Sequence, residues 1–207
     1  MNNLPEQEIK KLYRRYIWVW IFAHIRFWTG SYKEIEAFIP RVGNIVDFGC
    51  GYGIFANYLG ICSPKRKIIG VDTDDKKIKK AYHGLKNVSL KIGDATTMNL
   101  KKIRAVILHD VIHHLSSHRK QEIIIENCFN MLEANGELLI VEIDNYSVWK
   151  LISTRLTDFF MYKGGKVLYR YQSDLLQLLS RFFPRKNIEI IRLHNNPFPQ
   201  QLYICRK

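Results

Sequence analysis

From residue 44 onward, short apolar runs rich in Val and Ile alternate with segments in which apolar residues recur at helical spacing. The runs are typical of buried strands, and the helical recurrence is typical of helices packed on a sheet. This alternation predicts a doubly wound α/β fold, a parallel sheet with helices on both faces. The expected strands are 44–48, 67–72, 88–92, 104–109, 136–143, 187–193 and 201–206. The expected helices are 53–61, 74–83, 117–132, 147–161 and 173–183, the last with Ser173 as its N-cap.

An aromatic segment, Tyr16 to Ile25, precedes this alternating region. On a helix its apolar side chains fall into two stripes. The first stripe, expected to dock onto the main domain, consists of Tyr13, Tyr16, Ile17, Trp20, His24 and Phe27. The second stripe, flanked by Arg14, Arg15 and Arg26, consists of Trp18, Phe22 and Ile25. The protein's own core is one partner for such a helix, and a membrane interface or a second subunit is the other, unless both stripes are buried within one chain.

The apolar run of this segment ends after about ten residues at His24 and Arg26, whereas a membrane-spanning helix needs ~20. Basic residues precede the run as in a signal peptide, but no small-x-small cleavage site follows it. We therefore expect a cytoplasmic protein, with peripheral contact at the inner face of the membrane as the alternative that the second stripe leaves open.

The next residues suggest where the N-terminal extension ends. Ser31 and Glu34 form the S-x-x-E pattern of a capping box, which predicts a second short helix over 32–38. Pro40 and Gly43 then end this helix and lead into the first strand. Since 207 residues suit one domain with a proper core, we divide the chain into a helical extension, 1–40, and a main domain, 41–207.

Composition and charge narrow the class of protein only slightly. The four cysteines form no CxxC pair, which argues against a zinc knuckle or a disulfide scaffold and favours reduced thiols. The net charge is +13, and residues 150–207 carry eleven Lys or Arg against three Asp or Glu. A basic surface attracts nucleic acid, anionic lipid headgroups or acidic metabolites, and charge alone does not choose among them.

The strongest local motif is a glycine-rich turn, DFGCGYG (47–53), between the first strand and the first helix of the main domain. Glycines let the backbone adopt positive φ and approach a ligand closely, which is typical of a cofactor-binding turn. Asp72 ends the second strand, and Asp94 follows the third. Both carboxylates should lie at the edge of the sheet where open α/β folds bind ligands. A dinucleotide is disfavoured because its fingerprint needs a third glycine at Ile54.

Five ordered segments resemble the successive motifs of class I S-adenosylmethionine-dependent methyltransferases. They are VDFGCGYG (46–53), GVDTD (70–74), GDAT (93–96), ILHDVIHHL (107–115) and LEANGELLIVEI (132–143). The resemblance implies a Rossmann-like, seven-stranded sheet whose last strand is antiparallel, and S-adenosylmethionine as the cofactor. Residues 41–207 would then be the methyltransferase domain.

The resemblance also implies roles for individual residues. The methionine part of the cofactor would be held by Asp47 and the backbone of Gly49, Cys50, Gly51 and Gly53. Asp72, followed by Thr73, would bind the ribose hydroxyls, and Asp94, with Ala95 beside it, the adenine amino group. His109 and Asp110 would line the cofactor pocket at the end of the fourth strand.

Methyl transfer from a sulfonium is an in-line displacement, so an enzyme must mainly align the acceptor and exclude water. A hydroxyl acceptor profits from a general base, and we single out His113 and His114 as candidates, against the alternative that they only pack a loop. Tyr13 and Tyr16 are weaker candidates for closing over the site. We expect no metal site, because the carboxylates and histidines lack ligand spacing.

Three functional hypotheses remain from the sequence. The first is methylation of a small or lipid-like hydrophobic acceptor, favoured by the aromatic helix and by residues 161–166 as a substrate loop. The second is RNA or protein methylation guided by the basic surface; nucleic acid is weakened because His109-Asp-Val-Ile stands where base-amino methyltransferases carry an Asn/Asp-Pro-Pro-Tyr/Phe motif. The third is a non-catalytic partner subunit, which the intact cofactor motifs disfavour.

Overall fold

The computed structural model describes residues 4–143, 167–194, 197–198 and 200–207. Its strands are β1 (Gly43–Phe48), β2 (Arg66–Asp72), β3 (Val88–Ile92), β4 (Ile103–His109), β5 (Leu132–Ile143), β6 (Ile188–Arg192) and β7 (Gln200–Arg206). Its α-helices are α1 (Leu4–Leu12), α2 (Ile17–Thr29), α3 (Tyr32–Glu36), α4 (Ile54–Cys62), α5 (Asp75–Lys80), α6 (His118–Met131) and α8 (Gln172–Leu179). Two 3₁₀ turns, η1 (Ile112–His114) and η2 (Arg185–Asn187), complete the described elements.

The seven strands form one sheet in the order β3-β2-β1-β4-β5-β7-β6. Strands β3, β2, β1, β4 and β5 pair in parallel, whereas β7 runs antiparallel to both β5 and β6. The expected Rossmann-like fold with an antiparallel last strand is therefore confirmed. The order reverses at β1 and β4, and a reversal of this kind opens a crevice at the carboxyl ends of the strands.

Side chains alternate across the strands and build two cores. Ile45 and Ile107 face the side covered by α1, α2, α3 and α4, whereas Val46 and Leu108 face the side covered by α6 and α8. Both cores are fully buried at these positions, which explains why the strands read as continuous apolar runs. The N-terminal helices belong to the first core, because Ile9, Val19 and Ala23 are part of it.

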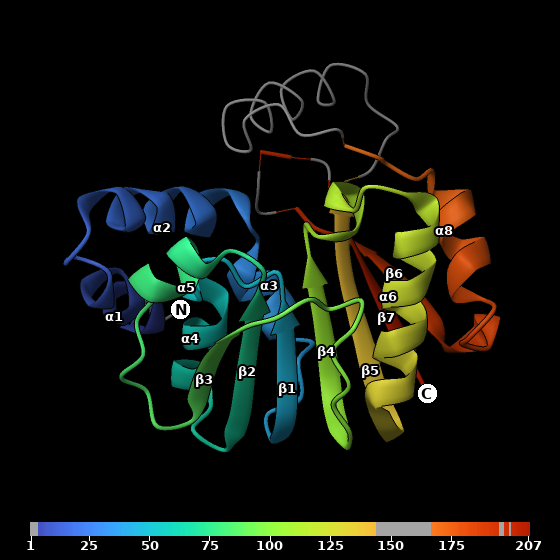
Figure 1. Ribbon diagram of the computed structural model, residues 1–207, viewed down its shortest axis with the longest axis horizontal. Coiled ribbons are helices and arrows are strands. Elements are labelled where there is room, and N and C mark those ends of the chain that lie inside the picture. Colours follow the sequence, from blue (N-terminus) through green and yellow to red (C-terminus); the bar gives the residue numbers. More distant parts are fainter. Residues whose placement is uncertain (1–3, 144–166, 195–196, 199) are drawn as a thin grey trace.

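Helix α2 lies above α1 and α4, level with the carboxyl ends of the parallel strands (Figure 1). A buried arginine ties the segment after α3 to the sheet: the Arg66 guanidinium donates to the carbonyls of Ile39 and Pro40 and pairs with Glu36 at 2.7 Å. The extension therefore packs as part of the same body as the sheet. Among the described helices, none is long and apolar enough to cross a membrane.

Several local expectations were wrong. α8 begins at Gln172 with Tyr171 as its N-cap, while the Ser173 hydroxyl bonds to Asp174. The capping box does not form, because Ser31 adopts φ 49° and Glu34 accepts the backbone N–H of His194 instead. Helix α5 ends at Lys80, so the expected helix over 74–83 is shorter. The expected helix 147–161 and the substrate loop 161–166 lie outside the described residues.

The assignment of the two α2 stripes was right for Tyr13 and Phe27, which join the first core, and wrong for three other residues. Tyr16 and Ile17 are exposed, although we expected them to dock, and Phe22 packs inward against the first core. The chain leaves helical geometry between α1 and α2, over 13–16, so a single helical wheel through this segment has the wrong phase. The buried residues of α2 are Val19, Ala23 and Thr29, and the first two belong to the first core.

Candidate active site

The glycine-rich turn between β1 and α4 has the positive φ angles that its sequence suggests. Gly49, Gly51 and Gly53 have φ values of 73°, 56° and 68°. A Cβ on Gly49 would lie 2.5 Å from Val111, so this position also needs glycine for space. The Gly51 N–H donates to the Asp72 carboxylate at 2.7 Å, which fixes the turn against the tip of β2.

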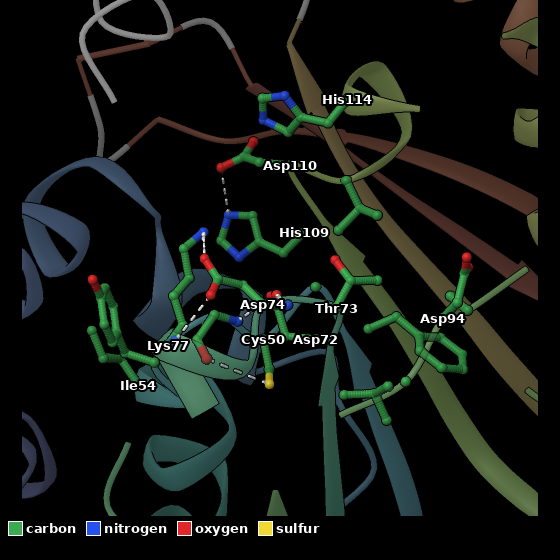
Figure 2. Close-up of a pocket in the computed structure, with 18 of the residues that line it drawn as sticks. Cys50, Ile54, Asp72, Thr73, Asp74, Lys77, Asp94, His109, Asp110 and His114 are labelled. Atoms are coloured by element: carbon green, nitrogen blue, oxygen red, sulfur yellow. Dashed lines mark hydrogen bonds and ion pairs between the residues drawn. The ribbon is translucent and has the colours of Figure 1, made fainter. Parts of the chain in front are cut away.

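A cavity of about 480 Å³ opens at the carboxyl ends of the strands, beside this turn. This volume is within the usual ~300–1,000 Å³ of small-molecule sites. Figure 2 shows Asp72 and Cys50 on one wall, Asp94 on the opposite one, and His109, Asp110 and His114 from the end of β4. Its other lining residues are Phe22, Arg26, Tyr32, Phe48, Gly49, Gly51, Tyr52, Ile54, Val71, Thr73, Asp74, Lys77, Gly93, Ala95, Val111, Leu115 and Ile124.

Most residues that the sequence singled out line this cavity, and three do not. Asp47 is buried at the end of β1, directly before the lining residues Phe48 and Gly49. Gly53 is the N-cap of α4 and lies next to Ile54 in the turn. His113 is buried on the far side of η1, where it lines a separate small cavity with Glu142.

Asp47 has an unusual environment for a carboxylate. It is 2% exposed, and its Oδ2 atom has no hydrogen-bond partner among the described residues. Burial and then the negative charge of Asp72 raise the pKa of Asp47 to about 7. An unsatisfied buried carboxylate is costly, and a cationic or hydrogen-bonding ligand nearby would offset that cost.

Asp72 and Asp94 are more fully hydrogen-bonded. Asp72 accepts the N–H of Gly51 and, at 2.8 Å, the N–H of Asp74, and it faces the cavity. Asp94 accepts the backbone N–H and the hydroxyl of Thr96, which lower its pKa. Because each carboxylate has about four acceptor positions, these contacts leave capacity for a ligand.

The end of β4 carries a charged cluster at the mouth of the cavity. Asp110 has φ 56°, pairs with the Arg26 guanidinium at 3.0 Å and accepts from the Gln200 amide. Burial alone would raise the pKa of Asp110, but His109 and Arg26 hold it at about 2. Burial lowers the pKa of His109 to about 4, so its ring is neutral at pH 7.

A chain of three side chains connects β5 to the cavity. His113 Nδ1 lies 2.6 Å from Glu142 Oε2, and His113 Nε2 lies 3.1 Å from His114 Nε2. Only His114 of these three lines the cavity, where burial and then the proximity of His113 lower its pKa to about 3. We predicted both histidines as catalytic, but His113 does not reach the cavity. Consecutive residues in a 3₁₀ turn point about 120° apart, so only one of the two side chains faces it.

Sequence reasoning missed residues that the tertiary fold brings to the site. Phe22, Arg26 and Tyr32 from the extension line the cavity, as does Lys77 from α5. Tyr13 and Tyr16, which we expected near the site, do not line it. The Tyr13 hydroxyl instead donates to the Tyr52 carbonyl at 2.7 Å. Of these residues, only Arg26 could have been suspected from the sequence, because a charged residue in an apolar helix needs a partner.

The described residues fit S-adenosylmethionine. Five carboxylates gather around the cavity, at positions 47, 72, 74, 94 and 110, and the cofactor carries a cationic sulfonium and an ammonium group. The unsatisfied oxygen of Asp47 and the open space beside Gly51, where an added Cβ would meet only Lys77 at 3.9 Å, are consistent with a ligand at the turn.

Known proteins support this assignment. A methyltransferase domain family matches residues 20–193. Ribosomal RNA small subunit methyltransferase C of Stutzerimonas stutzeri strain A1501 is 29% identical over 130 residues, which are 58% of this chain and 39% of that protein. The chain spans less than half the length of the curated relatives that it matches.

Two solved structures have the same fold. An S-adenosylmethionine-dependent methyltransferase of Methanosarcina mazei is 18% identical and superposes with a TM-score of 0.61 over 84% of this chain and 96% of that one. Magnesium protoporphyrin IX methyltransferase of Synechocystis PCC 6803, solved with bound S-adenosylhomocysteine, is 14% identical, with a TM-score of 0.64 over 86% of this chain and 82% of that one. The family match covers most of the chain and agrees with the five motifs and the sheet order, so the chain belongs to the methyltransferase domain family, as a class I S-adenosylmethionine-dependent methyltransferase.

Proposed function

We propose that this protein transfers the methyl group of S-adenosylmethionine to a small or lipid-like hydrophobic acceptor. The observation that carries the proposal is the apolar and aromatic part of the cavity lining. There Phe22, Tyr32, Leu115 and Ile124 supply apolar and aromatic surface. Such walls with a few convergent polar groups are typical of sites for small apolar molecules.

In this proposal the cofactor occupies the side of the cavity formed by the glycine-rich turn, β2 and β3. Asp72, next to Thr73, accepts hydrogen bonds from the ribose hydroxyls, and Asp94, beside Ala95, accepts one from the adenine amino group. Asp47 and the backbone of the turn from Gly49 to Gly53 bind the methionine part. When bound, S-adenosylmethionine supplies an electrophilic methyl group on a sulfonium.

The acceptor then lies between α2 and the end of β4. Phe22 and Tyr32 hold its apolar part and exclude water, and His109 and Asp110 separate it from the strand tips. Alignment of this kind supplies most of the rate enhancement for a displacement reaction. The translational and rotational entropy of the two reactants is lost on binding and not in the chemical step. No residue needs to form a covalent bond to the acceptor.

We assign proton transfer to His114. The Glu142 carboxylate requires a proton on His113 Nδ1, and we propose that the lone pair of His113 Nε2 accepts the Nε2–H of His114. His114 then carries its own lone pair on Nδ1. Its pKa of about 3 makes it a weak base, which suits an acceptor that ionises easily, such as a phenol or an enol, better than an aliphatic alcohol.

The alternative acceptor is RNA or protein. It is favoured by the relative from Stutzerimonas stutzeri, which is named for ribosomal RNA, and by the net charge of +13. Binding to a polyanion through Lys and Arg weakens steeply with salt. The cytoplasm is the compartment that we propose for either acceptor.

The deciding experiment is incubation of the protein with methyl-labelled S-adenosylmethionine and a cell extract, followed by partition of the label. We expect label in the organic-solvent fraction, absent with Asp72→Ala. Label in the RNA or protein fraction would overturn the hydrophobic acceptor in favour of the alternative. Label in no fraction, together with failure to bind S-adenosylhomocysteine, would support a non-catalytic subunit.

A further inference from the structure

The face of α2 that points away from the sheet is apolar and exposed. We define this outer face by five residues: Ile17, Trp18, Ile21, Ile25 and Trp28. Trp18 is 79% exposed, Trp28 66% and Ile17 58%. At helical periodicity the five side chains fall within an arc of ~100°, so they form one continuous stripe. Large apolar patches of this kind on a soluble surface mark an interaction site.

Basic groups lie at the N-terminal end of the outer face. Arg14 and Arg15 are exposed in the turn that leads into α2. Arg15 also lines a cleft of about 270 Å³ between this turn and the end of α5, together with Lys79, Lys80 and His83. None of the residues that line the cleft is acidic, although Lys79 pairs at 2.5 Å with Asp75, which lies outside the lining.

We propose that the outer face of α2 and this basic cleft form a docking surface for an anionic phospholipid bilayer. The tryptophans and isoleucines enter the boundary between headgroups and acyl chains, where Trp is favoured. Amphipathic helices of this type bury their apolar face ~5–10 Å deep, and adjacent cations bind anionic headgroups. The cleft receives a phosphate group of the lipid headgroup.

Charge favours a bilayer over a second copy of this chain. In a twofold dimer the outer face of one copy packs against the outer face of the other. The residues at one end of this face then meet either the same residues or the other end of the face in the second copy. The outer face itself offers no acidic residue to pair with Arg14 and Arg15, and each chain carries a net charge of +13. An anionic surface neutralises these cations, whereas self-association brings further positive charge.

The benefit of docking to a bilayer rests on the proposed function, a lipid-like acceptor, whereas binding to vesicles can be measured without it. Helix α2 contributes Phe22 and Arg26 to the cavity from the flank beside the outer face. Docking would therefore hold the cavity mouth within one helix diameter, ~10–12 Å, of the headgroup layer. A lipid-like acceptor could then reach the site without crossing bulk water.

Sedimentation with vesicles tests the proposal on the full chain. We expect binding to vesicles of phosphatidylcholine mixed with phosphatidylglycerol, and weak binding to phosphatidylcholine alone. The double variant Trp18→Ser with Trp28→Ser should lose at least tenfold in affinity, because both side chains would leave the acyl boundary. Arg15→Gln and Lys80→Gln should each lose about fivefold, only with the anionic vesicles.

Matched controls come from exposed residues elsewhere. Val42→Ser and Ile92→Ser remove apolar side chains that are 53% and 55% exposed, and Arg119→Gln removes an exposed cation. All three should bind vesicles like the unchanged protein. Equal binding by the double tryptophan variant, or no binding by the unchanged protein, would overturn the docking surface. A dimer in light scattering that the same variant turns into a monomer would also overturn it.

The two proposals fail separately. Label in the organic fraction without vesicle binding would refute the docking surface alone. Vesicle binding with label only in RNA would refute the hydrophobic acceptor and leave the docking surface standing.

Discussion

The guanidinium of Arg26 in α2 lies 3.0 Å from the carboxylate of Asp110 at the end of β4, and both side chains are largely buried. The two residues are 84 positions apart in the chain. The pair joins the N-terminal extension to the switch point of the sheet, where the cavity opens. It also helps to keep Asp110 ionised, since the pKa of this carboxyl is about 2 although burial alone would raise it.

Arg26→Met should therefore destabilise the protein at neutral pH by about 3 kcal/mol, because it leaves a buried carboxylate without its cation. The folded pKa of Asp110 lies below its unfolded value, so the stabilisation is present above pH ~4 and is lost as the pH falls toward 2. Urea denaturation should show a large difference from the unchanged protein at pH 7 that shrinks at pH ~3. Arg26→Lys should recover part of the loss, and a pH-independent difference would contradict this account.

Asp47→Asn should have opposite effects on stability and on cofactor binding. The folded pKa of Asp47, about 7, lies above its unfolded value, so its contribution is complete below pH ~4 and is lost as the pH rises through 7. At pH 8 the variant should melt several degrees higher than the unchanged protein, in the absence of ligand. Its affinity for S-adenosylmethionine should fall about tenfold, because the negative charge that we propose for the methionine part of the cofactor is gone. A calorimetric titration and a thermal scan at pH 5 and pH 8 test both statements, and unchanged affinity would remove Asp47 from the cofactor site.

Asp72→Ala should abolish measurable binding of S-adenosylhomocysteine while the protein stays folded. The substitution removes the acceptor of the ribose hydroxyls and the acceptor of the Gly51 N–H at the same time. Hydrogen bonds to a charged group contribute ~1.5–3 kcal/mol each. We expect at least a 100-fold loss of affinity in calorimetry, with the circular dichroism unchanged. Asp75→Ala, which removes an exposed carboxylate of α5, is the matched control and should bind normally.

Glu142→Gln should slow methyl transfer without weakening cofactor binding. In the proposed mechanism Glu142 is a positioning residue: it fixes the proton on His113 and so the tautomer of His114. The glutamine no longer requires that proton, so kcat should fall ~10–100-fold, at or below the ~10²–10⁴-fold that general acid–base catalysis usually contributes. The KM for S-adenosylmethionine should stay the same, and His114→Ala should cause a similar loss. A rise in KM with kcat unchanged would mean that the three side chains only support the fold.

The parts of this site that could be predicted from the sequence are those encoded in short segments. The glycine-rich turn, Asp72 and Asp94 each follow a strand directly, so strand order and the carboxyl-end rule were enough to bring them together. Arg26 and Tyr32 could not be assigned in this way, because the groups that they meet at the end of β4, Asp110 and His109, are distant in sequence. The different surroundings of His113 and His114 depend on the 3₁₀ geometry of η1, which an HHL triplet does not reveal.

The position of α2 also affects how the chain folds during synthesis. This helix leaves the ribosome well before β4, and at ~5–20 residues per second the partner of Arg26 follows after several seconds. Until then Val19, Ala23 and Phe22 have no sheet to cover, and the outer face is exposed as well. The nascent chain thus carries a helix that is apolar on both sides beside a run of basic residues, which is the kind of segment that chaperones bind. Translation speed between residues 30 and 110 is then expected to set the yield of folded protein.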